Sequence, residues 1–164
     1  MTDKTYSTES KLRESVIEHL FLGELTRTLW CQGKRDIEIL RSEVDNSGYD
    51  VVVGCNGIMR YIQLKSSYAG AKTSRIGVNL RLKNKPDGCV IWLWFNEKTM
   101  DFEKLLWFGG TPGETMPDLG DKIARHSKGN QTGYKAERPN QRIINKGQFS
   151  TFTTMKEVAM ELFG

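Results

Sequence analysis

The chain has 164 residues, of which 38% are hydrophobic and 27% are charged, and its formal net charge is +4. These values predict a single globular domain over residues 1–164 and exclude a disordered chain. No apolar run approaches the ~18 residues of a membrane-spanning helix, and residues 1–7 lack the apolar segment of a signal peptide. We therefore expect a cytoplasmic protein that has no membrane partner.

The three cysteines, Cys31, Cys55 and Cys89, are odd in number and far apart in the sequence. This spacing argues against a disulfide framework and against a Cys-x-x-Cys metal site. We expect reduced thiols that are mostly buried.

Positive charge is concentrated in two stretches. Residues 51–86 contain seven Lys or Arg and no Asp or Glu, and residues 122–146 contain seven Lys or Arg and one acid, Glu137. Such tracts attract a polyanion such as DNA, although solvated protein faces are also often locally basic. The residues that we expect to contact nucleic acid are Lys72, Arg75, Lys122, Arg125 and Lys128.

Residues 10–30 carry apolar side chains at helical spacing, which predicts the longest helix of the chain. Thr8 or Ser10 would cap this helix. The apolar positions are Leu12, Val16, Ile17, Leu20, Phe21, Leu25 and Leu29.

Two carboxylates lie within this apolar pattern. At ~100° per residue, Glu14 and Glu18 fall between apolar positions, where a carboxylate without a partner is costly. Each is therefore expected to have a partner or to face a metal. The alternative is an exposed flank on which they pair with Lys11 and Arg13.

Residues 37–40 predict a strand, and residues 45–48 predict a turn. Residues 48–65 then predict two strands that turn at Asn56-Gly57, since Asn-Gly between β-rich runs is a strong hairpin signal. With a two-residue loop, the numbers of facing residues add up to 113, so Asp50 faces Gln63. Alternation places Lys65 on the same face as Gln63.

The remainder of the chain predicts more strands. Residues 76–82 alternate as a strand does, but we favour a short helix at 78–84. Residues 89–95 are apolar on both faces, as in a central strand, so Trp92 and Trp94 are expected in the core. Further expectations are a strand at 104–108, a short helix at 118–126, a stretch without clear period at 127–145, a strand at 148–153, and a last helix, to residue 163, opened by a capping box at 154–157.

The arrangement of Asp50, Gln63 and Lys65 resembles the active-site hairpin of the PD-(D/E)xK nuclease superfamily, above all its Mrr-like and Holliday-junction-resolvase-like branches. In those branches the Asp often follows Gly-x, as it does here after Gly48-Tyr49. Gln63 stands where many members carry a second carboxylate. The resemblance covers roughly the first half of the chain, and its motifs are short.

This resemblance implies an α/β (α+β) fold with a restriction-endonuclease-like core: a mixed central sheet flanked by helices in αβββαβ order, with an added β-hairpin and a C-terminal strand and helix. The second core helix is the reason for favouring a helix at residues 78–84. The implied activity is that of a DNA endonuclease that hydrolyses phosphodiester bonds with Mg²⁺ or Mn²⁺.

The resemblance also implies roles for individual residues. Asp50, Gln63 and the backbone carbonyl of Leu64 would be the metal ligands. Lys65 would orient or deprotonate the attacking water or stabilise the charged phosphate. A Glu of the first helix would point at the site, and Glu18 is preferred over Glu14. The expected catalytic set is thus Glu18, Asp50, Gln63 and Lys65.

Three alternatives remain open at this point. In the first, Asp50 and Lys65 form an ordinary cross-strand ion pair, worth up to ~1 kcal/mol when exposed. In the second, the chain is a catalytically inactive nuclease-fold module that binds DNA. In the third, it is a protein-interaction domain, for example a homodimer that uses the aromatic hairpin at residues 92–108.

Overall fold

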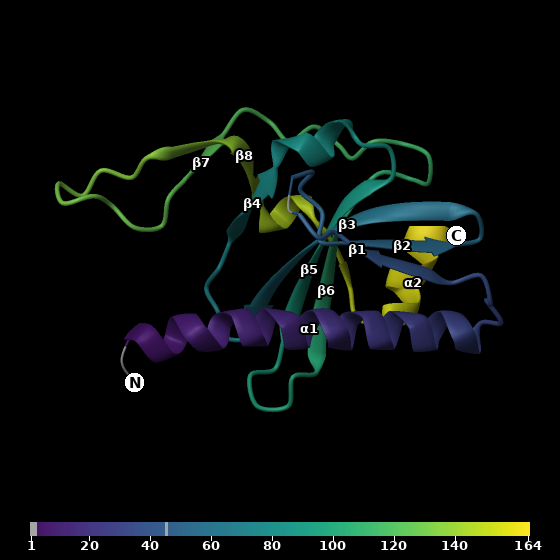
Figure 1. Ribbon diagram of the computed structural model, residues 1–164. Helices are drawn as coiled ribbons and strands as arrows, with labels where there is room; N and C mark the ends of the chain where they lie inside the picture. Colours follow the sequence, from purple (N-terminus) through teal and green to yellow (C-terminus); the bar gives the residue numbers. More distant parts are fainter. Residues whose placement is uncertain (1–2, 45) are drawn as a thin grey trace.

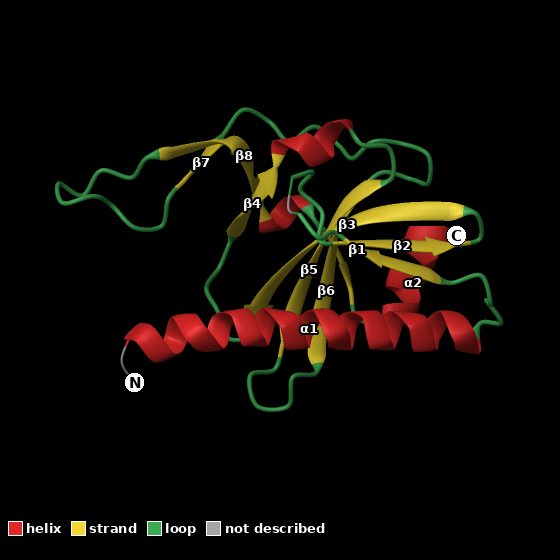
Figure 2. Ribbon diagram, in the orientation of Figure 1, coloured by secondary structure: helices red, strands yellow, loops and turns green. Residues whose placement is uncertain are grey.

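A computed structural model describes residues 3–44 and 46–164 of the chain, with side chains from Glu9 onward. It shows a mixed α+β arrangement of two sheets, two α-helices and two short 3₁₀-helices (Figures 1 and 2). In chain order the elements are α1 (Asp3–Cys31), β1 (Glu38–Arg41), β2 (Val51–Cys55), β3 (Ile58–Tyr68), β4 (Arg75–Asn79), η1 (Leu80–Asn84), β5 (Gly88–Phe95), β6 (Phe102–Gly109), β7 (Ile123–Arg125), β8 (Glu137–Asn145), η2 (Lys146–Gln148), β9 (Ser150–Phe152) and α2 (Met155–Phe163).

The larger sheet has six strands in the order β1-β2-β3-β5-β6-β9. Strands β3 and β5 are parallel, and the other neighbours are antiparallel, so the sheet is mixed. The smaller sheet is antiparallel, in the order β4-β8-β7. No helix of the described chain is long and apolar enough to cross a membrane.

Both faces of the large sheet are covered, and β5 shows why. Every residue of β5 is buried, as expected for a central strand. Ile91 and Leu93 belong to the core under α1 and α2, whereas Trp92 and Trp94 belong to the core under the small sheet. Because side chains alternate along a strand, this single apolar run supplies both cores.

The aromatic hairpin of β5 and β6 is therefore interior structure. Trp92 and Trp94 are buried, as predicted, and so are Trp107 and Phe108. The use of this hairpin as an exposed dimer face is thus wrong, because the small sheet and the α-helices cover its two sides.

The expected second core helix is absent from residues 78–84. Strand β4 occupies residues 75–79, and only the 3₁₀-helix η1 follows it. Parallel strands need a long crossover, which is usually helical; here β4 and η1 form the crossover from β3 to β5. Strand β4 pairs with β8, from Arg75↔Asn145 to Asn79↔Gln141, and this distant partner selects the strand conformation.

Residues 118–145 also differ from expectation. The helix expected at 118–126 is replaced by β7, and the stretch at 127–145 contains β8. A hydrogen bond from the backbone N–H of Gly120 to Asp118 Oδ1 (2.6 Å) and a φ of 71° at Gly120 form a turn instead.

Some of the predicted caps and turns match the structure and others do not. Helix α1 begins at Asp3, before either expected capping residue. Of the turn expected at 45–48, Asp45 lies outside the described residues, and Gly48 has a φ of 82°. Helix α2 has the predicted capping box, in which the Thr154 hydroxyl accepts from the backbone N–H of Glu157.

The cysteines are all free, as expected. Cys55 and Cys89 are buried, and burial raises the pKa of Cys89 to about 12. Cys31, at the end of α1, is exposed, so two of the three thiols are buried, which agrees with the expectation of mostly buried thiols.

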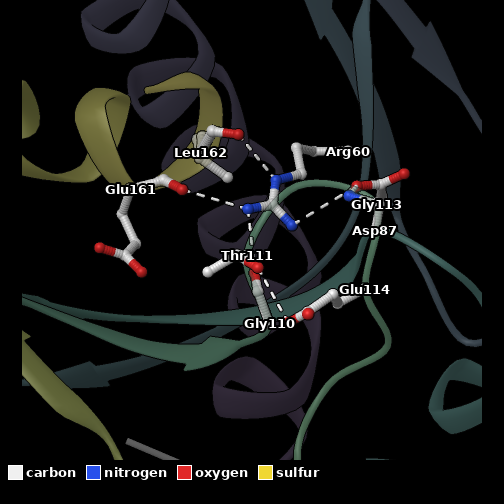
Figure 3. Close-up of polar contacts among 8 residues, drawn as sticks. All are labelled: Arg60, Asp87, Gly110, Thr111, Gly113, Glu114, Glu161 and Leu162. Atoms are coloured by element: carbon white, nitrogen blue, oxygen red, sulfur yellow. Dashed lines mark hydrogen bonds and ion pairs between the residues drawn. The ribbon is translucent and has the colours of Figure 1, made fainter.

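A buried arginine fastens α2 to the large sheet (Figure 3). Arg60 on β3 has no exposed side-chain surface. It donates to the carbonyls of Leu162 (2.8 Å), Glu161 (3.1 Å) and Gly110 (3.0 Å), and its Nη1 lies 3.9 Å from Asp87 Oδ1. The last carbonyls of a helix lack intrahelical donors and carry partial negative charge, so the guanidinium caps α2.

Candidate active site

The hairpin of β2 and β3 has the predicted register. Val51 faces Ile62, and Cys55 faces Ile58, so the facing numbers add up to 113. Asn56 and Gly57 form the two-residue loop with positive φ values of 55° and 73°. Both residues of a type I′ turn need positive φ, which is why Asn-Gly specifies this loop and this register.

Strand β3 continues well past the point where β2 begins. Regular pairing starts at Val51, while β3 runs on to Tyr68. Asp50 lies at this junction, and its carboxylate takes the place of a strand partner: Oδ2 accepts a 2.7 Å hydrogen bond from the backbone N–H of Leu64. The Asp50 backbone N–H donates to the Ile62 carbonyl (2.9 Å), and its carbonyl accepts from Ser42 (3.3 Å). Backbone contacts on both sides thus fix this carboxylate.

A cavity of about 130 Å³ lies beside this junction, between α1 and β3. Three carboxylates and one ammonium line it. Its lining residues are Glu14, Ile17, Glu18, Asp50, Leu64, Lys65 and Ser66. The structure therefore brings together three of the four expected catalytic residues, Glu18, Asp50 and Lys65, and adds the second helix candidate, Glu14.

The two helix carboxylates differ in their surroundings. Glu18 retains 25% of its side-chain exposure and forms a 3.3 Å ion pair with Arg41 of β1. Glu14 is exposed, so the expected embedding in apolar surface is wrong for Glu14. The ion-pair partner of Glu18 is a strand residue that sequence reasoning did not consider, because only the fold places β1 beside α1.

Gln63 has a different position from the other expected site residues. It is only 9% exposed, and it is not one of the lining residues of the cavity. Within the described part of the chain, its buried Oε1 has no hydrogen-bond partner. Gln63 shares its strand face with Tyr61, which packs against the core under the small sheet. Lys65 shares that strand face too, but unlike Gln63 it lines the cavity.

The residues expected to contact nucleic acid are exposed and lie on or next to the small sheet. Lys72 is in the loop from β3 to β4, and Arg75 begins β4. Lys122, Arg125 and Lys128 lie on or beside β7. They come from distant parts of the sequence, and the pairing of β4 with β8 and of β8 with β7 brings them into one layer.

A second cavity, of about 210 Å³, adjoins the first at Ser66, and it is lined by a residue that the sequence indicated only as an ion-pair partner. Arg13 of α1 lines it together with Ser67, Tyr68 and Thr73. The available signal was spacing, since Arg13 precedes the buried Ile17 by one helical turn and so shares its side of α1.

The carboxylates that line the first cavity can be compared with the ligands that a divalent cation requires. Among the described residues, no three His, Cys, Asp or Glu side chains are clustered closely enough to enclose a metal by themselves. Mg²⁺ does not require such a cluster, because it retains several waters and usually binds one or two protein carboxylates. Asp50 and Glu18, which line one cavity, meet that smaller requirement.

No protein-family model matches the chain, and the search of curated proteins finds no match.

Proposed function

We propose that the chain is a metal-dependent nuclease that hydrolyses phosphodiester bonds in DNA and is built on a restriction-endonuclease-like core. The observation that carries this proposal is the cavity at the open edge of β3, where Asp50, Glu18 and Lys65 lie together. The order helix, antiparallel β1-β2-β3 and parallel β5 supports the same proposal. The crossover built from β4 and η1 would be a departure from the helical crossover of that core.

Each residue has a distinct role in this proposal. Asp50 and the carbonyl of Leu64 would hold the metal, with Glu18 as a further anionic group and Glu14 as its alternative. When bound, Mg²⁺ or Mn²⁺ would supply an activated water and positive charge near the phosphate. Lys65 would position that water and offset negative charge on the phosphate, an effect that is strongest in a partly desolvated cavity.

The test is nicking of supercoiled plasmid and of branched DNA by the purified protein across a titration of Mg²⁺ and of Mn²⁺. Asp50→Asn should abolish metal-dependent nicking, and Lys65→Ala should lower its rate by about 100-fold or more. Glu97→Gln is the matched control, since Glu97 is exposed in the turn between β5 and β6. Absence of nicking by the wild type on every DNA form would overturn the proposal.

One observation favours a second candidate, a nuclease-fold module that binds DNA without cleaving it. Gln63 supplies no charge, and it lies outside the cavity that contains the other site residues. This module would bind DNA through the exposed basic residues on and next to the small sheet. Salt-dependent DNA binding without nicking in either metal would establish it in place of the enzyme.

A further inference from the structure

A basic hairpin projects from the small sheet. Residues 122–142, which we name the basic arm, comprise β7, the first part of β8 and the loop between them. In Figure 1 the arm extends beyond the rest of the molecule, and Figure 2 shows that most of its outer part is loop. Residues 125–140 are all exposed, so this segment adds little to either core.

The base of the arm is nevertheless anchored in the protein core. Ala124 of β7 is only 4% exposed, and Ile144, just beyond the arm on β8, is fully buried. The backbone N–H of Ile143 donates to the Lys122 carbonyl at 2.8 Å. The direction in which the arm leaves the protein is therefore set by the core beneath the small sheet.

The two limbs of the arm stay together as far as its tip. The His126 N–H donates to the Ala136 carbonyl (2.9 Å), and the Asn130 N–H donates to the Tyr134 carbonyl (2.8 Å). At the tip, Asn130 Oδ1 accepts from the Thr132 N–H (3.0 Å), the Thr132 hydroxyl (2.7 Å) and the Tyr134 N–H (2.9 Å). The arm is thus an ordered two-limbed ribbon, and it presents Tyr134 with 58% of its surface exposed.

The charge of the arm is mostly positive. Its 21 residues include six Lys or Arg and one acid, Glu137. Glu137 forms a 3.4 Å ion pair with Arg125. The remaining five basic residues are Lys122, Lys128, Lys135, Arg138 and Arg142, and they come from both limbs.

We propose that the basic arm binds duplex DNA by lying in the major groove. The major groove of B-form DNA is about 12 Å wide and admits a two-stranded β-ribbon. Lys128 on one limb and Lys135 and Arg138 on the other would contact the phosphates that border the groove. This inference rests on the proposed function, and it specifies double-stranded, B-form DNA as the substrate class.

The shape of the arm also predicts selectivity. Double-stranded RNA has a deep, narrow major groove that side chains cannot read. A two-limbed ribbon fits the wide major groove of B-form DNA but not this narrow one. The arm should therefore add affinity for duplex DNA and little for duplex RNA of the same sequence.

The test measures fluorescence anisotropy of labelled duplex DNA, duplex RNA and single-stranded DNA across a salt series. The arm variant combines Lys128→Ala, Lys135→Ala and Arg138→Ala. The control variant removes the same charge from exposed residues outside the arm: Lys98→Ala, Lys104→Ala and Lys156→Ala. In the arm variant, duplex DNA affinity at about 0.1 M salt should fall at least tenfold and the salt slope should decrease by about 1 to 3, since each phosphate contact contributes about 0.9.

A second readout locates the groove. Methylation of guanine N7 by dimethyl sulfate reports on the major groove, because N7 lies there. The wild type should protect N7 positions, and the arm variant should lose this protection. Any of three results would overturn the inference. The arm and control variants could lose the same duplex DNA affinity, the arm variant could lose as much affinity for duplex RNA as for duplex DNA, or the arm variant could keep the N7 protection of the wild type.

The experiments distinguish failure of the arm inference from failure of the proposed nuclease activity. If wild-type protein nicks plasmid while the arm variant binds duplex DNA as tightly as the wild type, the arm inference alone fails. If no nicking occurs but the arm variant loses duplex affinity and N7 protection, the arm inference stands and the catalytic proposal fails.

Discussion

The carboxylate of Asp50 accepts a 2.7 Å hydrogen bond from the backbone amide of Leu64, fourteen residues later in the chain. This bond lies just before β2 begins, where β3 continues without β2 on that side and pairs only with β5. It gives Asp50 two functions, since the side chain that closes the edge of a strand also lines the cavity beside α1.

The structural function of Asp50 should be separable from its charge. Asp50→Ala leaves the Leu64 amide without its acceptor and should lower the free energy of unfolding by about 1–2 kcal/mol. Asp50→Asn keeps an acceptor oxygen and should cost less than half as much. Urea denaturation of both variants measures the difference. Equal losses would show that the hydrogen bond adds no stability.

Gln63 does not line the cavity, so Gln63→Glu tests whether a second carboxylate can serve the site from this neighbouring position. If the chain is an active enzyme, Gln63→Glu should preserve metal-dependent nicking or tighten metal binding, measured by calorimetry. Gln63→Met is the companion variant, because removing a buried oxygen without a partner should be neutral or stabilising by about 1 kcal/mol. A large loss of stability in Gln63→Met would mean that the amide has a structural partner after all.

Arg41 should compete with metal for Glu18. Their ion pair is partly exposed, so Arg41→Gln should change stability by at most about 1 kcal/mol. If Glu18 is the functional carboxylate, this substitution should raise Mg²⁺ affinity, and Glu18→Gln should lower it more than Glu14→Gln does. The reverse order of the two Glu variants would assign the role to Glu14.

Arg60 should be among the residues on which stability most depends. Arg60→Met leaves three carbonyls, those of Gly110, Glu161 and Leu162, without this donor. We expect a loss of about 3 kcal/mol or more in the free energy of unfolding. The control is Arg125→Met, which removes an exposed ion pair and should cost at most about 1 kcal/mol. A cost for Arg60→Met as small as that of the control would contradict this account of α2 capping.

The capping box of α2 should make stability depend on acidic pH. Hydrogen bonds from the Thr154 hydroxyl and from the backbone amides of Thr153 and Thr154 lower the pKa of Glu157. A lowered pKa in the folded state gives stability that is present above the unfolded pKa and is lost as the pH falls through the folded pKa. Glu157→Gln should therefore destabilise the protein at about pH 7 and have a smaller effect at about pH 3. A pH-independent effect of Glu157→Gln would contradict the assignment.

The sequence by itself determined the features that depend on near neighbours. Asn56-Gly57 specifies a type I′ turn through its two positive φ values, and this turn fixes the register from Cys55↔Ile58 to Val51↔Ile62, which Asp50 directly precedes. The capping box at 154–157 and the continuous apolar run of β5 are equally local signals. Each could be predicted because its cause lies within a few residues of its effect.

Only the tertiary structure decided the features that depend on distant partners. Residues 75–79 form a strand because β8, more than sixty residues later, supplies hydrogen bonds that no local pattern reveals. Arg60 is buried because the carbonyls of α2, about a hundred residues away, arrive beside it. Gln63 lies outside the cavity while Lys65 lines it, because β2 does not extend along this part of β3 and residues of α1 line the cavity there instead. Strand alternation gives the face of a side chain, but the contacts that it makes depend on which elements pack against that face.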